Sequence, residues 1–149
     1  MLIIGCDFHT RYQQIAMARK ETAELLLERR LDHHNGEAHA FYRSLQSLQE
    51  PVRVGIEATG PVHWFERLLA DLSHQLWIGD SPRFARWKCA SRKPLARAAA
   101  HILSLLLKED FPRIWIPTPA ERDLRQLLWH RHKLVTLPPC WATSCMRWP

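Results

Sequence analysis

Hydrophobic and polar residues change their spacing along the 149 residues of this chain, and the changes predict a sheet flanked by helices. The first three apolar or alternating segments have short polar connections, which favours an antiparallel meander. Helical spacing then alternates with two short strand patterns, as in β-α-β crossovers. The predicted elements are, in order, strands at 2–8, 11–18 and 24–31, a helix at 37–48, a strand at 52–57, a helix at 61–72, a strand at 75–79, and helices at 95–108 and 118–135.

The helical spacing also predicts which side chains of each helix enter the core. In the helix at 37–48 these are Ala38, Phe41, Leu45 and Leu48. In the helix at 95–108 they are Leu95, Ala98, Ile102 and either Leu105 or Leu106. The segment from Thr118 to Glu121 has the form of a capping box, so the last helix is predicted to begin there. Its apolar side carries Leu124, Leu127, Leu128 and Leu134.

Acidic residues stand at the ends of two predicted strands. Asp7 follows a short apolar run, and Glu57 ends a strand in which alternation places it on the face opposite Val52, Val54 and Ile56. A meander followed by crossovers is the RNase-H-like arrangement, and it brings the ends of the first and fourth strands side by side. Metal-dependent phosphoryl-transfer enzymes hold acidic ligands at such strand ends. The pattern therefore predicts that Asp7 and Glu57 are catalytic and bind a divalent metal ion.

The formal charge of +6 and the pI near 9.5 give the chain a moderate basic bias. Part of that charge lies in a block without acids, which contains Arg83, Arg86, Lys88, Arg92, Lys93 and Arg97. Such a block can neutralise phosphates and release counterions, so these residues are predicted to bind nucleic acid. A solvated basic face without a ligand is the alternative interpretation.

Composition excludes several classes of protein. A hydrophobic content of 46% argues against wholesale disorder. No stretch approaches the roughly 20 apolar residues that span a bilayer, and the first residues lack the basic region of a signal peptide. A cytoplasmic protein without a membrane partner is therefore predicted. The four cysteines lack metal-finger spacing and are expected to be free thiols, and His33, His34 and His39 are expected to be structural rather than zinc ligands.

Three blocks of sequence carry a family resemblance when they are taken in order. They read IGCDFH at 4–9, GIEATGP at 55–61, and FPRIWIP at 111–117 followed by ERDLR at 121–125. Together they resemble the N-terminal domain of the DEDD-type insertion-sequence transposases, the family that includes the Piv-like site-specific DNA invertases. The resemblance implies an α/β fold of the RNase-H-like (RuvC-like) type, with a mixed sheet, flanking helices, a C-terminal helix and an irregular tail.

The resemblance also implies a Mg²⁺ site made by four acids in the order Asp, Glu, Asp, Asp. Asp7 and Glu57 match the first two. The family's last two acids lie in a Lys-Thr-Asp-x-x-Asp-Ala segment after the basic block, and here Leu95 and Ala98 replace both. Because Mg²⁺ prefers several hard oxygen ligands, the loss of two acids predicts very weak or absent cleavage.

The resemblance divides the chain into three parts. These are an RNase-H-like domain at 1–117, the start of a connecting helix at 118–135, and an atypical tail at 136–149. Family members continue that helix as a long basic segment and add a second domain with a nucleophilic serine. Here Pro138 and Pro139 end the helix, so a frameshifted or truncated reading frame is expected.

The sequence thus predicts a truncated transposase N-terminal domain, from a lineage that performs Mg²⁺-dependent DNA cleavage and strand transfer. DNA is the expected partner. One alternative is a non-catalytic module that binds DNA or a structured guide RNA, or that assembles with itself or with intact transposase. A decayed gene fragment without a selected function is the other alternative.

Overall fold

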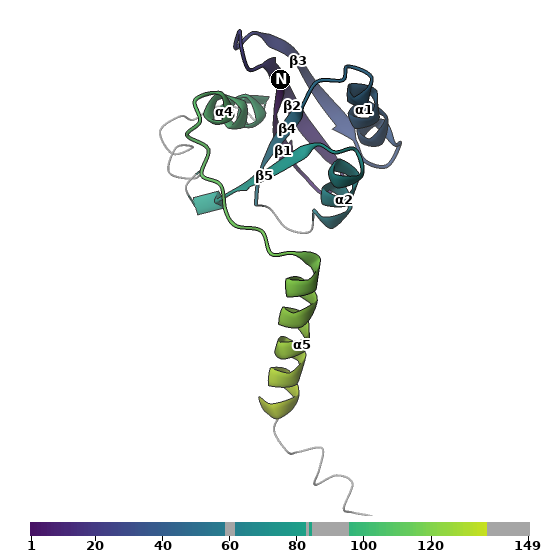
Figure 1. Ribbon diagram of the computed structural model, residues 1–149, viewed down its shortest axis with the longest axis vertical. Helices are drawn as coiled ribbons and strands as arrows, with labels where there is room; N and C mark the ends of the chain where they lie inside the picture. The colour runs from purple at the N-terminus through teal and green to yellow at the C-terminus, as the bar shows by residue number, and fades with distance from the viewer. Residues whose placement is uncertain (59–61, 83, 85–95, 137–149) are drawn as a thin grey trace, which may run out of the picture. The chain divides into compact units, whose positions relative to one another are not determined.

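The computed structural model describes residues 1–58, 62–82, 84 and 96–136. It divides into two units, Met1–Ile114 and Trp115–Pro149. The boundaries predicted at 117 and 135 stay predictions. The named elements of the first unit are β1 (Leu2–Phe8), β2 (Tyr12–Arg19), β3 (Leu25–Asp32), α1 (Glu37–Gln46), β4 (Val52–Glu57), α2 (His63–Asp71), β5 (Gln75–Gly79) and α4 (Ala96–Leu107) (Figure 1).

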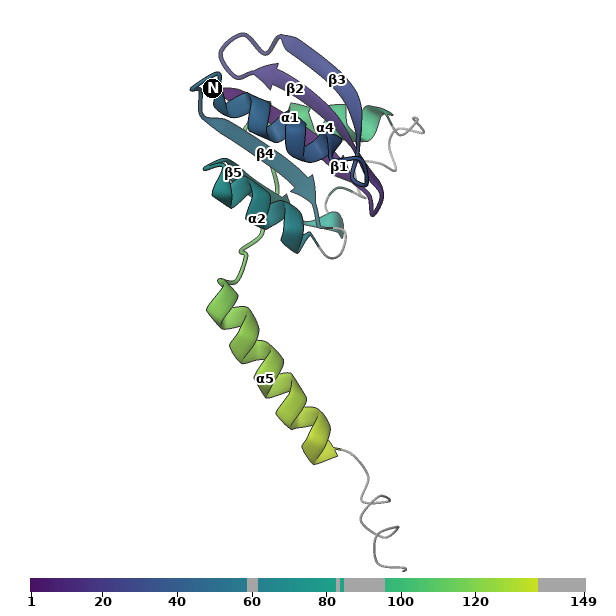
Figure 2. The same ribbon diagram turned by 90° about the vertical axis from the view of Figure 1, so that its right-hand side faces the viewer.

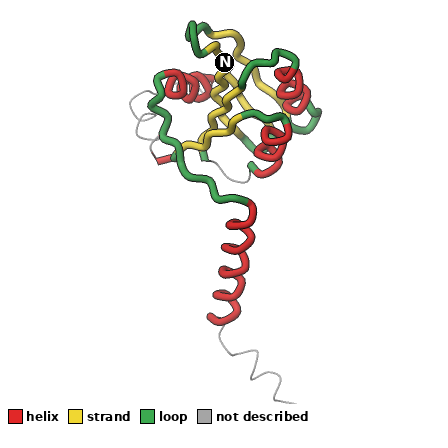
Figure 3. The backbone as a smooth tube through the Cα atoms, in the orientation of Figure 1, coloured by secondary structure: helices red, strands yellow, loops and turns green. Residues whose placement is uncertain are grey.

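The described strands of the first unit form one sheet (Figure 3), and their order in it is β3-β2-β1-β4-β5. β2 pairs antiparallel with both β1 and β3, whereas β4 pairs parallel with both β1 and β5. The predicted meander and the two crossovers are therefore confirmed. Because parallel strands end at the same edge, the carboxyl ends of β1, β4 and β5 lie together there.

Helices cover both faces of this sheet. α1 and α2 lie on one face, and α4 lies on the other (Figures 1 and 2). On the first face, the ring of Phe65 in α2 lies 5.4 Å from that of Phe8 in β1 and 5.1 Å from that of Tyr42 in α1. Phe65 and Tyr42 are completely buried, so these aromatic contacts join the two helices to the sheet.

The second face carries its own apolar cluster beneath α4. Gly5 in β1 allows the close approach of this helix, because a Cβ atom at Gly5 would collide with the backbone of Ala99 and Leu103. The cluster consists of Ile3, Ala16, Ala18, Phe84, Ala99, Ile102, Leu103, Leu105, Leu106 and Phe111. The sheet is therefore the middle layer between two cores.

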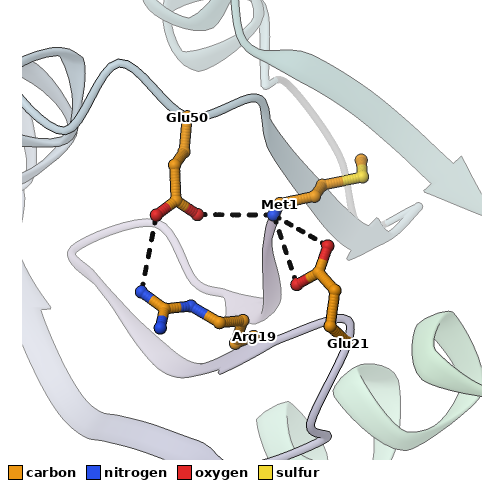
Figure 4. A network of polar contacts seen from close by, with 4 residues as sticks. All are labelled: Met1, Arg19, Glu21 and Glu50. Atoms are coloured by element: carbon orange, nitrogen blue, oxygen red, sulfur yellow. Dashed lines mark hydrogen bonds and ion pairs between the residues drawn. The ribbon is translucent and has the colours of Figure 1, made fainter.

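Polar contacts at the surface fix the start of β1 (Figure 4). The Met1 ammonium group donates to Glu21 Oε1 at 3.0 Å and to Glu50 Oε2 at 3.3 Å, and Arg19 Nη2 donates to Glu50 Oε1 at 3.4 Å. The hydrogen bond to Glu21 is the largest effect that raises the pKa of this amino group. These contacts tie the first residue to the connection between β2 and β3 and to the segment before β4.

The named element of the second unit is α5 (Pro119–Thr136). The predicted capping box is confirmed: the Thr118 backbone N–H donates to Glu121 Oε2 at 2.7 Å, and the Glu121 N–H donates to Thr118 Oγ1 at 3.3 Å. The apolar side chains of α5 are solvent-exposed, among them Leu124, Leu127, Leu128, Trp129, Leu134 and Val135.

Two of the core positions predicted for α1 are wrong. The helix ends at Gln46, and Leu48 is 52% exposed beyond its last turn. Tyr42 enters the core where Phe41 was expected, because Tyr42 lies four residues after Ala38 and three before Leu45 on the buried stripe.

The predicted core of α4 is shifted in phase. Ala98 is only partly buried, whereas Ala99, Ile102, Leu103 and Leu106 are buried at the spacing i, i+3, i+4 and i+7. The prediction counted from Leu95, which lies outside the described residues. Ile102, Leu105 and Leu106 are buried as predicted.

Candidate functional site

Asp7 and Glu57 lie next to each other across two parallel strands. The register pairs Cys6 with Ile56, so the next residue on each strand brings Asp7 beside Glu57. Gly5 and Gly55 both face α4, since an added Cβ atom at either position would meet residues of that helix. Alternation along the strands places Asp7 and Glu57 on the same face, two residues farther along. The two side chains predicted to act together are therefore neighbours at one edge.

Each of these carboxylates is largely buried and has a polar partner of its own. Asp7 is 8% exposed, and its Oδ2 lies 3.3 Å from Nε2 of His9. Glu57 is 7% exposed, and its Oε1 accepts a hydrogen bond of 2.7 Å from the Ser81 hydroxyl group. A buried carboxylate needs such partners, because it has lost its hydration.

Sequence reasoning missed His9 and Ser81 as partners of the two acids. His9 lies in the same sequence block as Asp7, but their contact depends on how the chain turns after β1. Ser81 follows β5 and belongs to none of the predicted elements. Its contact with Glu57 follows from the pairing of Glu57 with Gly79, which brings the end of β5 beside the end of β4. Only the register between β4 and β5 would have predicted the contact between Ser81 and Glu57.

The direction of α4 shows which end of this helix lies closer to Asp7. Near Gly5 the helix presents Ala99 and Leu103. Beyond its other end, Glu109 Oε1 lies 2.7 Å from Nζ of Lys20, whose backbone N–H donates to the Met1 carbonyl oxygen. α4 therefore runs antiparallel to β1, and its first turn is the end closer to Asp7.

The described residues do not form a complete magnesium site. The sequence of α4 contains no acid, and Ala98 occupies its first turn. Across the described part of the chain, no group of three His, Cys, Asp or Glu side chains could hold a metal ion. Mg²⁺ takes an octahedron of oxygen ligands and is commonly held by one or two carboxylates together with waters and substrate phosphates, so Asp7 and Glu57 provide part of such a ligand set.

Most of the basic block falls outside the described residues. Arg83, Arg86, Lys88, Arg92 and Lys93 belong to the segments that the structure does not describe. Arg97 belongs to the first turn of α4. The predicted binding of nucleic acid by these six residues stays a prediction.

On the other face of the sheet, at the same end of β1, uncharged polar side chains are buried in the core. The Cys6 thiol group donates to Gln13 Oε1 at 3.3 Å, and the Tyr42 hydroxyl group is buried beside Cys6. Burial raises the pKa of the Cys6 thiol far above its ordinary value, and it also raises the pKa of Tyr42. These groups are therefore neutral parts of the core.

Two of the three histidines considered as zinc ligands pack against Trp64. The His33 ring lies 4.9 Å from the Trp64 ring, and His39 stacks on Trp64 at 5.2 Å. Burial is the main effect that lowers the pKa of His33, which favours the neutral imidazole. These contacts give His33 and His39 a packing role beside Phe8.

Among comparisons with known proteins, one solved structure supports the fold. No family model and no curated protein matches the chain. RuvC of T. thermophilus in complex with a Holliday junction substrate has a TM-score of 0.52 and 12% identity, over 76% of this chain and 99% of that one. Another Thermus thermophilus RuvC structure has a TM-score of 0.44 and 15% identity, over 80% and 84%. An exopolyphosphatase from Cytophaga hutchinsonii has a TM-score of 0.38 and 10% identity, over 58% and 36%.

The sheet order, the strand directions and the first of these similarities define a RuvC-like fold of the RNase H-like class. The predicted fold class is confirmed for the mixed sheet with flanking helices, whereas the predicted irregular tail lies outside the described residues from 137 onward. Within the described residues, no helix combines the length and the hydropathy needed to cross a membrane.

Proposed function

We propose that this chain is a DNA-binding domain of the DEDD-type transposase lineage whose cleavage activity is very weak or absent. One observation carries the proposal. Asp7 and Glu57 lie side by side at the strand ends, while the helix whose first turn points toward that edge contains no acid. The arrangement preserves half of an acidic site and lacks the half that α4 would supply.

The distribution of charge supports DNA as the partner. The chain has a formal charge of +6, and six cations without an acid lie between Arg83 and Arg97. RuvC of T. thermophilus, which shares the fold, binds a Holliday junction substrate. The affinity of a basic protein for DNA falls steeply as the salt concentration rises, because its contacts with phosphates release counterions. Binding to a structured guide RNA stays a prediction.

DNA binding and cleavage are tested separately. The full chain is titrated onto a fluorescein-labelled 30-base-pair duplex between 50 and 200 mM salt, once with EDTA and once with Mg²⁺. We expect salt-dependent binding that is the same in both buffers, and no nicking of a supercoiled plasmid in Mg²⁺. Absence of binding to the duplex would overturn the proposal. Nicking by the wild type that Asp7→Asn abolishes would show an active enzyme instead.

A gain of function sharpens this test. The double substitution Leu95→Asp and Ala98→Asp places acids where the family has them. If α4 supplies the missing half of the site, the double variant acquires Mg²⁺-dependent nicking, and adding Asp7→Asn removes it again. A matched control places the acids at Ala100 and Ser104, farther along the same helix. Equal activity of the two double variants would contradict the assigned geometry.

A second candidate function is assembly with another copy of the chain, favoured by the exposed apolar side of α5. Leu124 and Leu127 are 59% and 67% exposed. The acids Glu121 and Asp123 lie near the start of the helix together with Arg122 and Arg125, whereas Arg131 and Lys133 lie near its end without an acid. An antiparallel pair centred on Leu127 would place Asp123 level with Arg131 of the second copy and bury both apolar sides.

Assembly is tested by light scattering after size-exclusion chromatography. The wild type is expected to be dimeric. Asp123→Lys and Arg131→Glu should each be monomeric alone, because like charges then meet, and an equimolar mixture should form a heterodimer. A monomeric wild type would exclude this candidate function.

A further inference from the structure

A row of polar side chains crosses the sheet from the candidate site to β3. The register pairs Asp7 with Gln14 on β2 and Gln14 with Arg30 on β3. Residues directly opposite each other on neighbouring strands point to the same face. Arg30, Gln14, Asp7 and Glu57 therefore lie in one row on the face that α4 partly covers.

Ring contacts hold Arg30 in this row. Its guanidinium carbon lies 3.9 Å from the centre of the Tyr12 ring, a cation–π contact. On the side toward the acids, the His9 ring lies 4.7 Å from the Tyr12 ring, and His9 Nε2 lies 3.3 Å from Asp7 Oδ2. A continuous chain of contacts thus leads from Asp7 through His9 and Tyr12 to Arg30.

The described residues leave this end of the face open. α4 packs on Ile3, Gly5, Ala16 and Ala18, which belong to the other half of β1 and β2. Arg30 is solvent-exposed, and Tyr12 and Gln14 are only partly buried. We call these three residues the Arg30 platform. It offers a planar cation, an aromatic ring and an amide on the side of the sheet that bears the acids.

We propose that the Arg30 platform binds the phosphodiester backbone of a DNA strand that passes Asp7, with Arg30 contacting a phosphate and Tyr12 holding Arg30 in position. The inference rests on the proposed DNA-binding function. Two strand spacings separate Arg30 from Asp7, or about 10 Å. A phosphate recurs about every 3.4 Å of helix axis along one strand, so Arg30 lies within a few nucleotides of the acids. A guanidinium group suits phosphate because it donates two parallel hydrogen bonds.

The neighbouring residue on β3 provides a matched control. Arg29 is also exposed, but it is paired with Ile15 and therefore points to the opposite face. There its guanidinium group forms an ion pair of 3.0 Å with Glu37 of α1. Arg29→Ala and Arg30→Ala remove the same charge from adjacent positions of one strand. The two substitutions differ in the face of the sheet from which the charge is removed.

The test is fluorescence anisotropy with the labelled 30-base-pair duplex over a series of salt concentrations. Arg30→Ala should weaken binding about tenfold at low salt, as expected for the loss of a charge-assisted hydrogen bond. It should also reduce the slope of log K against log salt by about one. Arg29→Ala should leave the slope unchanged. Equal slopes for the two variants would overturn the proposal.

The role of Tyr12 is tested by a double-mutant cycle. Tyr12→Leu keeps every charge but removes the ring beneath Arg30, so it should weaken DNA binding in the wild-type background. In the Arg30→Ala background it should have no effect, because the group that it positions is absent. If Tyr12→Leu weakens binding equally in both backgrounds, Tyr12 does not act through Arg30 and the assigned role is wrong.

These outcomes separate the two levels of the proposal. If the wild type does not bind the duplex, the proposed DNA-binding function fails and the platform fails with it. If the wild type binds but Arg30→Ala behaves like Arg29→Ala, the DNA-binding function stands and only the platform is overturned. Far-UV circular dichroism of each variant checks that the sheet is folded. If Arg30→Ala fails this check, it is replaced by Arg30→Gln, which keeps more of the side chain.

Discussion

Cys6 and Asp7 are neighbours on β1, yet they face two different environments. Cys6 points toward α1 and α2, where its thiol donates to Gln13 in a core closed by completely buried aromatic rings. Asp7 points to the face of α4, which packs on the other half of the strand and leaves the Arg30 platform exposed. A single strand thus carries a side closed by packing and a side that the described residues leave partly open.

The difference shows how the fold separates stability from chemistry. On the closed face, polar groups are neutral and enclosed, so burial keeps Cys6 and Tyr42 protonated. At the open edge, Asp7 and Glu57 each have a partner from a connecting segment, His9 and Ser81. Changes on the closed face should therefore affect folding, and changes at the open edge should mainly affect binding.

The largest effect is expected from a truncation on the closed face. Phe65 is completely buried against Phe8 and Tyr42, so Phe65→Ala should lower the free energy of unfolding by about 3–5 kcal/mol. Denaturation in urea measures the change. Leu25→Ala, at a position 53% exposed on β3, is the control and should cost less than about 0.5 kcal/mol. Similar losses for the two variants would contradict a closed core here.

Two glycines beneath α4 should differ in their tolerance of a methyl group. A Cβ atom at Gly5 would meet the backbone of Ala99 and Leu103, whereas at Gly55 it would meet the end of the Leu106 side chain, which can move. Gly5→Ala should therefore destabilise the fold by about 1–3 kcal/mol, and Gly55→Ala by less. Thermal unfolding of both variants checks the order. A larger loss at Gly55 would show that α4 packs differently on the sheet.

The pH dependence of stability should report the Cys6 thiol. Because burial raises its pKa in the folded state, the unfolded chain loses this proton first, near its ordinary value of 9.0. The stabilisation is fully present below pH 9 and is lost as pH rises above it, by up to about 1.4 kcal/mol per pH unit. Cys6→Ala should lack this component. Parallel pH profiles for wild type and variant between pH 8 and 10 would refute the assignment.

A smaller effect on stability is expected at the open edge. Asp7→Asn keeps the shape of the side chain but removes its charge, and its contact with His9 is partly exposed. The free energy of unfolding should change by less than about 1 kcal/mol, measured in urea without divalent metal. A loss of several kcal/mol would mean that Asp7 belongs to the closed side of the strand.

The sequence predicted the strands and helices and their order along the chain well. Periods of two and of 3.6 residues are local signals, so each element is indicated by its own segment. The resemblance and the predicted topology also placed Asp7 and Glu57 side by side. Boundaries and phases were less accurate. Leu48 was assigned to the core, yet α1 ends at Gln46, and the first proline after that end is Pro51, too far along the chain to mark the stop.

The partners of the acids and the Arg30 platform could not be predicted in the same way. Arg30 is one of two adjacent arginines, and only the pairing of Gln14 with Arg30 decides which of them faces the acids. His9 and Ser81 reach the carboxylates through turns after strands, whose course depends on tertiary packing. The contacts of Ser81 and Arg30 depend on the register of segments distant in the sequence, which a local pattern does not contain.

The central claim is that the sheet holds half of an acidic site without the part that α4 would complete. Isothermal titration calorimetry of Mn²⁺ into the wild type, Asp7→Ala, and Leu95→Asp with Ala98→Asp tests it most directly. We predict no saturable binding by the first two proteins and saturable binding by the third. Saturable binding by the wild type that Asp7→Ala abolishes would contradict the claim, because the two carboxylates would then suffice.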